Sequence, residues 1–255
     1  MIFDTRSLRT KVLASLALSR ASLATIETGA KISKNSALSR GDTGDPKLRS
    51  DLKNWAQKVC RAFDVRVSVR GEAMETGAGL LVGNHMSYID IPVLMSMEPL
   101  SFVAKAEVRS WPIIGPAAAG FGVIFIERSS DKSRKDTGET LRKAVLENRR
   151  RVVVFPEGTT SLRGLPWRAG VFKLAQEHQL PMQAMSICYR PAEPLAFESP
   201  SMLEHVMKLP DAGPIEAIVT FGPSFFVKDF LKDFAYWESW NKGVLAEELK
   251  RQGIV

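Results

Sequence analysis

The chain has 255 residues, of which 45% are hydrophobic and 25% are charged, values that suit one large globular domain with a core of its own. Its two cysteines match no metal or redox spacing, which argues against a disulfide framework and makes a reducing compartment the default expectation. The net charge of +7 belongs to the start of the chain, because residues 1–70 carry 14 Lys and Arg against 6 Asp and Glu, whereas residues 71–255 carry 21 against 22. A basic segment of this kind suits an anionic membrane, a nucleic acid or an acidic protein, or it is a solvated arm.

The first predicted element is a helix over residues 6–27. Five large apolar side chains recur there at roughly helical spacing: Leu8, Val12, Leu16, Leu23 and Ile26. Arg and Lys side chains lie on or near the other faces, and a basic amphipathic helix is typical of a segment that lies in a membrane interface. The apolar run is short and Ser-interrupted, which argues against a secretory signal, although an Arg- and Ser-rich start is also typical of a transit peptide.

The middle of the chain alternates between short apolar runs and helical patterns. Residues 29–50 lack apolar periodicity and are predicted to be a linker, followed by a helix over 52–63. The predicted strands cover residues 65–70, 79–84, 100–105, 122–127, 151–156, 182–188 and 216–222. Further helices are predicted over residues 134–149, 168–178 and 230–251.

Near-continuous apolar strands that alternate with helices indicate an α/β fold. We predict a central mixed, largely parallel sheet of about seven strands flanked by helices, preceded by an N-terminal helical membrane-associating segment. The N-terminal segment covers residues 1–62 and the α/β domain residues 63–255. Residues 111–126 carry no charge, but they fall short of the roughly 20 residues of a membrane span and are interrupted by Pro and Gly, so a short helix, a turn and a buried strand are predicted there.

Several familiar motifs are missing from the sequence. There is no Gly-x-Ser-x-Gly elbow and no phosphate-binding loop that ends in Gly-Lys-Ser/Thr. The glycines of residues 77–83 start and end a predicted strand, which does not fit a dinucleotide fingerprint. No His, Cys, Asp or Glu group has a recognisable metal spacing, so we expect neither a metal nor a bound cofactor.

Four titratable or charged side chains lie at or just past the carboxyl ends of predicted strands: His85, Lys105, Arg128 and Glu157. In an open α/β sheet, ligands bind outside the carboxyl ends of the strands. If these strands are parallel, all four residues share one edge of the sheet.

His85 and Asp90 are five residues apart, across the predicted change from strand to helix. Histidine is the side chain best suited to accept a proton near neutral pH, and as a general base it needs a partner that fixes its tautomer. The turn after Asn84 could fold Asp90 back towards the ring, and its main-chain N–H groups are candidate donors to an oxyanion. The alternative is that Asp90 caps a helix and His85 is a loop histidine, and spacing alone favours this alternative.

The sequence "FPEGTTS" over residues 155–161 follows an apolar strand. Gly158 allows close approach to the backbone, and Thr159 and Thr160 offer hydroxyl and main-chain donors. A strand end of this kind suits a phosphate or a polyol. The alternative is an ordinary turn that caps a helix.

Four sequence blocks resemble those of the glycerolipid acyltransferases related to 1-acylglycerol-3-phosphate acyltransferase. They occur in the family's order, within a resemblance that covers roughly residues 64–225: "NHMSYID", "GVIFIER", "FPEGTTS" and "LPMQAMSI". The resemblance implies transfer of a fatty acyl group from acyl-CoA or acyl carrier protein to the free hydroxyl of lysophosphatidic acid. A thioester donor is already activated, so this chemistry needs a base for the hydroxyl and no covalent enzyme nucleophile.

The resemblance also implies roles for individual residues. His85 would be the general base and Asp90 would orient it. Arg128, with Lys105 nearby, would meet the phosphate of the acceptor. Its glycerol phosphate end would be held by three consecutive residues, Glu157, Gly158 and Thr159. The fourth block, around Pro181, would shape the wall of the acyl site.

Thr160 departs from the family pattern, which often has arginine at this position. Threonine lacks the guanidinium that binds phosphate with two hydrogen bonds, so Arg163 or Arg168 compensates or the acceptor carries less phosphate. The "EGTTS" form resembles relatives that acylate other lyso-lipids, including lyso-ornithine lipid. We therefore expect a peripheral enzyme on the cytoplasmic face of an anionic membrane, with lysophosphatidic acid or another lyso-lipid as acceptor. A lipid-binding protein without catalysis is the rival from another class, and no nucleic-acid partner is expected.

Overall fold

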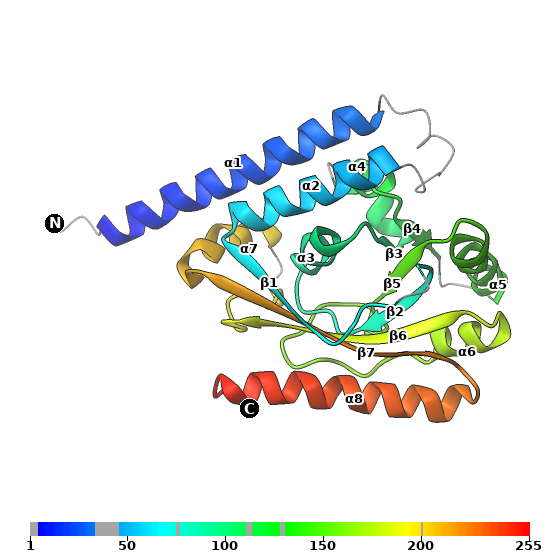
Figure 1. The fold of residues 1–255 in the computed structure, drawn as a ribbon. Coiled ribbons are helices and arrows are strands. Elements are labelled where there is room, and N and C mark those ends of the chain that lie inside the picture. The colour runs from blue at the N-terminus through cyan, green and yellow to red at the C-terminus, as the bar shows by residue number, and fades with distance from the viewer. Residues whose placement is uncertain (1–4, 34–45, 75–76, 111–113, 128–130, 200) are drawn as a thin grey trace.

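The computed structural model describes residues 5–33, 46–74, 77–110, 114–127, 131–199 and 201–255, and its centre is a seven-stranded sheet with helices on both faces (Figure 1). The strands are β1 (Val65–Arg70), β2 (Gly79–Gly83), β3 (Ser101–Lys105), β4 (Ile124–Ile126), β5 (Arg151–Val154), β6 (Pro181–Arg190) and β7 (Ile215–Phe226). Their order is β1-β7-β6-β2-β5-β3-β4. β2 to β6 all run in one direction, whereas β7 is antiparallel to β6, and β1 is parallel to β7. The prediction of a mixed, largely parallel sheet is confirmed.

The described helices are α1 (Thr5–Ser33), α2 (Pro46–Ala62), α3 (Asp90–Met97), α4 (Ile114–Gly120), α5 (Asp131–Arg142), α6 (Gly170–Glu177), α7 (Met202–Lys208) and α8 (Phe230–Arg251). Short helical turns cover residues 106–110, 143–147 and 209–212. α7 was not predicted. The predicted linker over residues 29–50 is wrong at both ends, because α1 continues to Ser33 and α2 begins at Pro46. Proline is tolerated in a first helical turn, and Leu48 is buried against the core, while residues 34–45 lie outside the described part of the chain.

Both faces of the central strands are buried, which accounts for their near-continuous apolar sequences. Leu81 and Val153 belong to the cluster that α2 and α3 complete, whereas Leu80 and Val152 belong to the cluster that α5 and α6 complete. Because β2, β5, β3 and β4 are parallel neighbours, their carboxyl ends meet at one edge of the sheet. This edge receives the residues that follow those strands.

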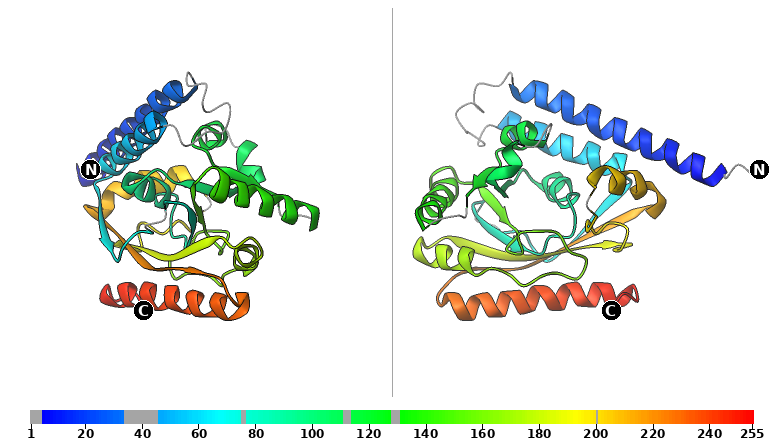
Figure 2. Two further views of the ribbon diagram at one scale, coloured as in Figure 1. Left: turned by 45° about the vertical axis from the view of Figure 1, so that its right-hand side comes forward. Right: turned by 180° about the vertical axis from the view of Figure 1, so that it is seen from behind.

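α1 packs along α2 through small side chains. The two helices run side by side in opposite directions, and the start of α1 extends past the rest of the molecule (Figures 1 and 2). From Val12 onwards, where the side chains of α1 are described, the buried ones are spaced three and four apart: Ala14, Ala17, Ala21, Ala24 and Thr28. Small residues allow close contact between helices, and Trp55 Nε1 adds a hydrogen bond to Thr25 Oγ1 of 2.9 Å.

The large apolar residues of α1 face the other way. Four described side chains of the predicted apolar set are 47–68% exposed: Val12, Leu16, Leu23 and Ile26. At 100° per residue they lie within an arc of about 80°, opposite the buried alanines. The side chain of Leu8 lies outside the described part of the structure. No helix within the described residues combines the length and the apolar character needed to cross a bilayer.

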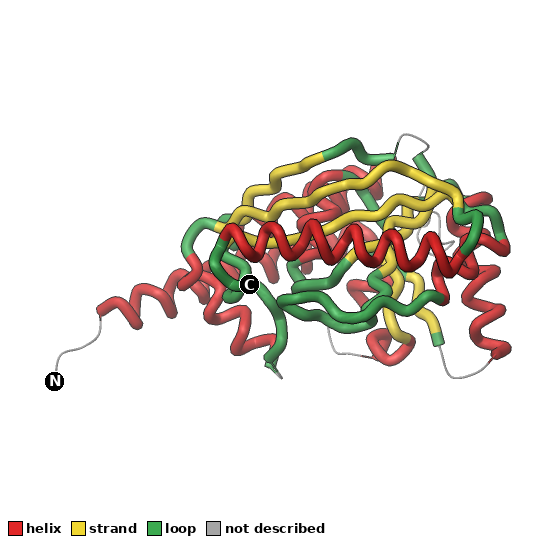
Figure 3. The backbone as a smooth tube through the Cα atoms, turned by 90° about the horizontal axis from the view of Figure 1, so that it is seen from below, coloured by secondary structure: helices red, strands yellow, loops and turns green. Residues whose placement is uncertain are grey.

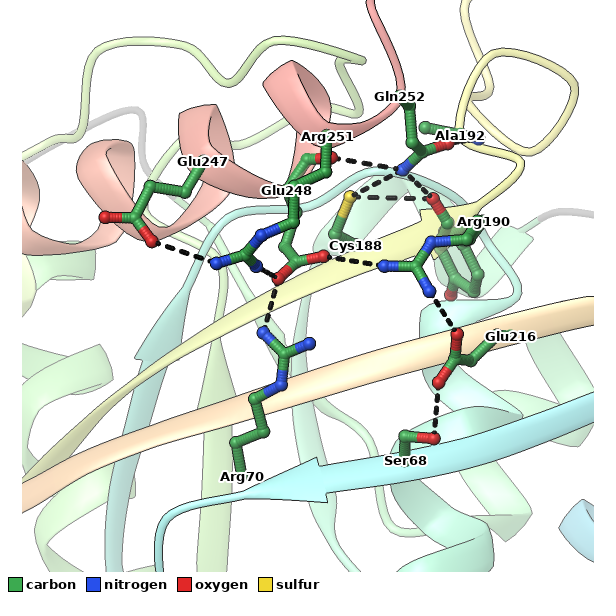
Figure 4. A network of polar contacts seen from close by, with 11 residues as sticks. Ser68, Arg70, Cys188, Arg190, Ala192, Glu216, Glu247, Glu248, Arg251 and Gln252 are labelled. Carbon is green, nitrogen blue, oxygen red and sulfur yellow. Dashed lines mark hydrogen bonds and ion pairs between the residues drawn. The ribbon is translucent and has the colours of Figure 1, made fainter.

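α8 is tied to the sheet by one buried carboxylate (Figure 4). The Glu248 side chain is 2% exposed and accepts hydrogen bonds from three guanidinium groups, those of Arg70 in β1, Arg190 in β6 and Arg251 in α8 itself. The Arg190 contact is 3.3 Å long. This network joins the last helix to strands that are far away in the sequence.

We expect Glu248→Gln to lower the free energy of unfolding by about 1–3 kcal/mol, the usual range for hydrogen bonds to a charged group. The loss stays below that of a fully buried ion pair, because the three arginine side chains are 45–50% exposed and regain water. Urea unfolding measures this quantity. Glu247→Gln is the matched control, since this 74%-exposed neighbour pairs with Arg251 at the surface, and we expect a loss of at most about 1 kcal/mol. Equal losses in the two variants would contradict the account.

Candidate active site

His85 lies just past the carboxyl end of β2, in a turn that leads into α3. The side chain of the preceding residue, Asn84, continues the pairing between β2 and β6. Asn84 Nδ2 donates to Ile187 O at 2.8 Å, and Asn84 Oδ1 accepts from Ile187 N at 3.0 Å. A side-chain amide thus takes over the role of the main chain, and the backbone is free to turn away from the sheet at His85.

The carboxylate of Asp90, the first residue of α3, folds back onto this turn. Its Oδ2 lies 2.6 Å from His85 Nδ1 and also accepts the N–H groups of Met86 and Ser87, at 2.9 and 3.1 Å. Its Oδ1 accepts the hydroxyl of Tyr189, whose pKa is raised well above its ordinary value, chiefly by burial, so that the hydroxyl stays protonated. The fully buried carboxylate therefore has four donors, one of which is the imidazole. This contact places the ring proton on Nδ1 and leaves Nε2 as an acceptor.

The imidazole is held by packing as well as by hydrogen bonding. The Phe155 ring, just after β5, stacks on it with a centroid distance of 4.0 Å and an angle of 3° between the planes. The His85 side chain remains 19% exposed, and its Nε2 is bonded to none of the described residues. A fixed ring with one free acceptor nitrogen is suited to take a proton from a bound group.

Glu157 follows β5, and its carboxyl group bonds the main chain of two segments, the His85 turn and the loop before α6. Its Oε2 accepts the N–H of His85 at 3.1 Å, and its Oε1 accepts the N–H of Leu165 at 3.2 Å. The side chain is 4% exposed, and this burial raises its pKa to about 7, with a smaller upward contribution from Asp90 that is opposed by the two N–H donors. Neither this cluster nor any other group among the described His, Cys, Asp and Glu side chains is arranged to hold a metal ion.

The raised pKa of Glu157 predicts a pH-dependent stability. The folded protein retains a proton that the unfolded chain releases between about pH 4.5 and 7, so this contribution to the free energy of unfolding is fully present below pH 4.5 and is lost as the pH rises through 7. We expect the difference in unfolding free energy between the wild type and Glu157→Gln to fall by about 2 kcal/mol from pH 5 to pH 8. Urea unfolding at both pH values measures it, with exposed Glu193→Gln as a control that keeps the wild-type dependence. A constant difference would contradict the prediction.

The main-chain donors of the His85 turn are already in use, which corrects one expectation. The N–H of His85 donates to Glu157, and those of Met86 and Ser87 donate to Asp90. These groups are therefore not available to an oxyanion. They serve instead to fix the two carboxylates around the imidazole.

The loop after Glu157 lies against the His85 turn. Ser161 N donates to His85 O at 2.8 Å, which brings "GTTS" next to the imidazole. Gly158 has a φ of +76°, a conformation that favours glycine and lets the loop turn tightly. Thr159 is exposed at the edge of the sheet, whereas the Thr160 hydroxyl donates to Phe197 O. Thr159 is thus exposed at the site, Gly158 is half-buried, and the Thr160 hydroxyl is bonded within the protein.

The structure locates only some of the basic side chains that were predicted to bind the acceptor's phosphate. Lys105 ends β3 and is exposed at the same edge as His85, beside the end of β4. Arg128, two residues after β4, lies outside the described residues. Arg163 and Arg168 are both exposed on the loop before α6, and the Arg163 guanidinium contacts Ile254 O at 3.4 Å. Of these four, Lys105 is the one that the described strand pairing fixes at the site edge.

The fourth sequence block does not lie at the site as a whole. Pro181 is the first residue of β6, and β6 runs parallel to β2, so Pro181 lies at the opposite edge of the sheet from His85. The expectation that Pro181 shapes the acyl wall is not supported by this position. It is the far end of the same strand, at Ile187 and Tyr189, that contacts the His85 turn.

Three contributors to the site were not predicted: Phe155, Tyr189 and Asn241. Phe155 is the first residue of "FPEGTTS", but an apolar residue at a strand end does not indicate ring stacking. Tyr189 lies two residues after Ile187 in β6, and Asn241 lies in α8, where its Nδ2 donates to Asn84 Oδ1. Only the tertiary pairing brings these residues to His85.

Comparison with known proteins identifies the class. A family model described as Acyltransferase matches residues 66–188. The chain is 30% identical to a lyso-ornithine lipid O-acyltransferase of Brucella abortus over 190 residues, which cover 66% of this chain and 70% of that protein. The chain therefore belongs to the acyltransferase family, and the predicted resemblance is confirmed.

Other relatives are named for two different acyltransferase activities. A lyso-ornithine lipid O-acyltransferase of Pseudomonas aeruginosa is 39% identical over 140 residues, 53% of this chain and 52% of that protein. A 1-acyl-sn-glycerol-3-phosphate acyltransferase of Neisseria meningitidis is 36% identical over 155 residues, 58% of this chain and 59% of that protein. The matches thus span little more than half of these two relatives.

The fold also matches a solved structure. The crystal structure of the 1-acyl-sn-glycerophosphate (LPA) acyltransferase PlsC from Thermotoga maritima superposes with a TM-score of 0.71. The match covers 96% of this chain and 98% of that one, with 18% sequence identity. The two chains therefore share a fold along almost their whole length.

Proposed function

We propose that the protein is an O-acyltransferase that moves a fatty acyl group from acyl-CoA or acyl carrier protein to the free hydroxyl of lysophosphatidic acid, giving phosphatidic acid. The observation that carries this proposal is the 2.6 Å contact between His85 Nδ1 and the buried Asp90 carboxylate, in a member of the acyltransferase family. Relatives that carry the name 1-acyl-sn-glycerol-3-phosphate acyltransferase support the choice of acceptor.

In this reaction His85 Nε2 takes the proton from the acceptor hydroxyl as its oxygen attacks the carbonyl carbon of the thioester. The new C–O ester bond forms as the C–S bond breaks, and the proton passes from His85 to the departing thiolate. Asp90 holds the ring and stabilises the imidazolium that forms during the transfer. Because the thioester is already activated, no acyl-enzyme intermediate is required.

The acceptor headgroup is proposed to bind along the edge formed by the ends of β3, β4 and β5. Lys105 and Arg128 supply positive charge for its phosphate, and Gly158 and Thr159 contact its glycerol end. Glu157 acts through the loop that it holds, because both of its oxygens already accept main-chain N–H groups. The bond from Ser161 N to His85 O joins this loop to the His85 turn, and a headgroup held by the loop would bring its hydroxyl to Nε2.

Lyso-ornithine lipid is the second candidate acceptor, and Thr160 favours it. This residue stands where the family often has a phosphate-binding arginine, and its hydroxyl is bonded to Phe197 O. Four relatives carry the name lyso-ornithine lipid O-acyltransferase. An acceptor without a phosphate would not need the missing guanidinium.

An acceptor panel tests the proposal. Purified protein is mixed with vesicles that contain lysophosphatidic acid, lyso-ornithine lipid or lysophosphatidylcholine, and each mixture receives labelled acyl-CoA or acyl carrier protein. A labelled diacyl product from lysophosphatidic acid supports the first acceptor, and a product from lyso-ornithine lipid alone replaces it with the second. Vesicle binding without thiol release from either donor would contradict both and favour a lipid-binding protein without catalysis.

We also propose that the protein binds the cytoplasmic face of an anionic membrane through the exposed apolar stripe of α1. The stripe consists of Val12, Leu16, Leu23 and Ile26, on a helix within the basic N-terminal part of the chain. An apolar stripe beside basic residues is the pattern of an interfacial helix. A lipid acceptor that stays in the bilayer gives such binding a purpose.

The double variant Leu16→Ser/Ile26→Ser is expected to bind anionic vesicles at least about 100-fold more weakly. Each side chain loses about 1.5–3 kcal/mol of burial in the interface, and 1.4 kcal/mol is a factor of ten. Vesicle cosedimentation measures the change, and both residues are exposed, so the fold is retained. Leu231→Ser on α8, where the leucine is 61% exposed, is the matched control and should bind like the wild type. Equal binding by the double variant would contradict the role of α1.

A further inference from the structure

Asn241 lies in the middle of α8, and its side chain is 1% exposed. α8 runs along β6 and β7 on the face of the sheet away from α2 (Figures 1 and 3). Asn241 Nδ2 donates to two oxygens, Met185 O at 2.7 Å and Asn84 Oδ1 at 3.2 Å. A buried amide is costly unless it is bonded, so this side chain is present for the two contacts that it makes.

Both acceptors lie where the regular pairing of the sheet ends. The pairing of β6 with β7 shifts register between Gln183 and Met185, and β2 stops at Gly83, which pairs with Met185. The chains approach closely there, since a Cβ on Gly83 would lie 2.5 Å from Met185 O. Asn241 therefore bonds the residues at the end of β2, where the chain leaves the sheet and enters the His85 turn.

The second contact fixes the orientation of the Asn84 amide. Asn84 Oδ1 accepts from both Ile187 N and Asn241 Nδ2. If the amide rotated by half a turn, its own Nδ2 would face these two donors. Asn241 thus holds the bonds by which Asn84 extends the sheet, and His85 is the next residue along the chain.

We propose that Asn241 is a positioning residue for acyl transfer, which fixes the Asn84 amide and through it the place of the His85 imidazole. The inference rests on the proposed function, because it assigns Asn241 to the reaction that His85 performs. Asn241 does not touch the substrate in this scheme. A displacement of the base by about 1 Å is enough to lower a rate by up to about 100-fold.

The test compares Asn241→Leu, which keeps the volume and removes the donor, with Leu249→Ala in the same helix. Leu249 is 1% exposed and lies eight residues after Asn241, about 12 Å along α8, so its loss lowers stability without removing a bond to Asn84. We expect Asn241→Leu to lower kcat at least about tenfold with KM within about twofold. Leu249→Ala should lower the unfolding temperature at least as far and keep kcat within about twofold.

A double-mutant cycle with Asn84→Ala measures whether the kcat losses of the two substitutions are additive. A general loss of stability would not make them depend on each other. If Asn241 acts through Asn84, adding Asn241→Leu to Asn84→Ala changes kcat by less than about twofold. If Asn241→Leu does not fold, Asn241→Ala replaces it, because alanine favours the helix and also lacks the donor. A wild-type kcat in the Asn241 variant or in Asn84→Ala would overturn the positioning role. It would also be overturned if the fold loss of kcat in the double variant equalled the product of the two single losses. A wild type that is inactive with every acceptor would instead overturn the proposed function, and with it the reaction that Asn241 serves.

Discussion

His85→Ala is expected to lower kcat for acyl transfer by about 100- to 10,000-fold, the usual contribution of a positioned general base. The structure supplies the reason, because Nε2 is the acceptor nitrogen of a ring whose other nitrogen is held 2.6 Å from Asp90. The alanine variant retains the main-chain bonds of the turn, in which His85 N donates to Glu157 and His85 O accepts from Ser161. Release of thiol from a labelled thioester, followed with saturating acceptor, measures the loss.

Two measurements on His85→Ala serve as its control: vesicle binding and the unfolding temperature. Vesicle binding should be unchanged, since α1 is far from the substitution in the chain and carries the apolar stripe. The unfolding temperature should remain close to that of the wild type. A variant with wild-type kcat would show that another group removes the proton, and the assigned mechanism would be wrong.

Asp90→Asn is expected to lower kcat by about 1,000- to 10,000-fold, as the loss of the orienting carboxylate does in hydrolases with a comparable His–Asp pair. An amide has one oxygen for the four donors that now surround Asp90, so its NH2 group must face at least one of them. The imidazole is then held in the wrong tautomer or the wrong place. The same steady-state assay measures this loss, and it must be run well below the unfolding temperature of the variant, because buried hydrogen bonds are also lost.

Tyr189→Phe is the matched control for Asp90→Asn. It removes one donor, the hydroxyl on Oδ1, and leaves the contact between Oδ2 and His85 Nδ1 intact. We expect its kcat to fall by less than about tenfold. If Tyr189→Phe and Asp90→Asn lost activity equally, the tautomer of His85 would not be what Asp90 controls.

The strands and their common edge could be predicted because local patterns specify them. A run such as residues 79–83 is apolar at every position, since its two faces pack on different helices. His85 and Glu157 directly follow such runs, and the parallel order of β2 and β5 brings them together. This reasoning requires no knowledge of distant contacts.

The partners of these residues could not be predicted, because distant parts of the chain supply them. Tyr189 is 99 residues from Asp90, and Asn241 is 157 residues from Asn84. Glu157 shows the same limit in another way. Its place at the site followed from the sequence, but its bonds to two main-chain N–H groups depend on how the loop folds back.

α1 shows how packing decides between two faces of one helix. The large apolar stripe was the obvious signal, yet the alanines on the other face make the contact with α2. Small side chains permit close approach of two helices, and the large ones are left at the surface. The helix was therefore predicted correctly, while its buried face was not identified.

Acyl transfer to a free hydroxyl is distinguished from hydrolysis of the thioester by a lyso-lipid whose hydroxyl is blocked. Thiol release and ester formation are followed together with the preferred lyso-lipid and with the same lipid carrying a methyl ether in place of the hydroxyl. We expect one ester formed for each thiol released with the free hydroxyl, and neither product with the methyl ether. Thiol release at the same rate with both lipids, or no ester with any lyso-lipid, would contradict it.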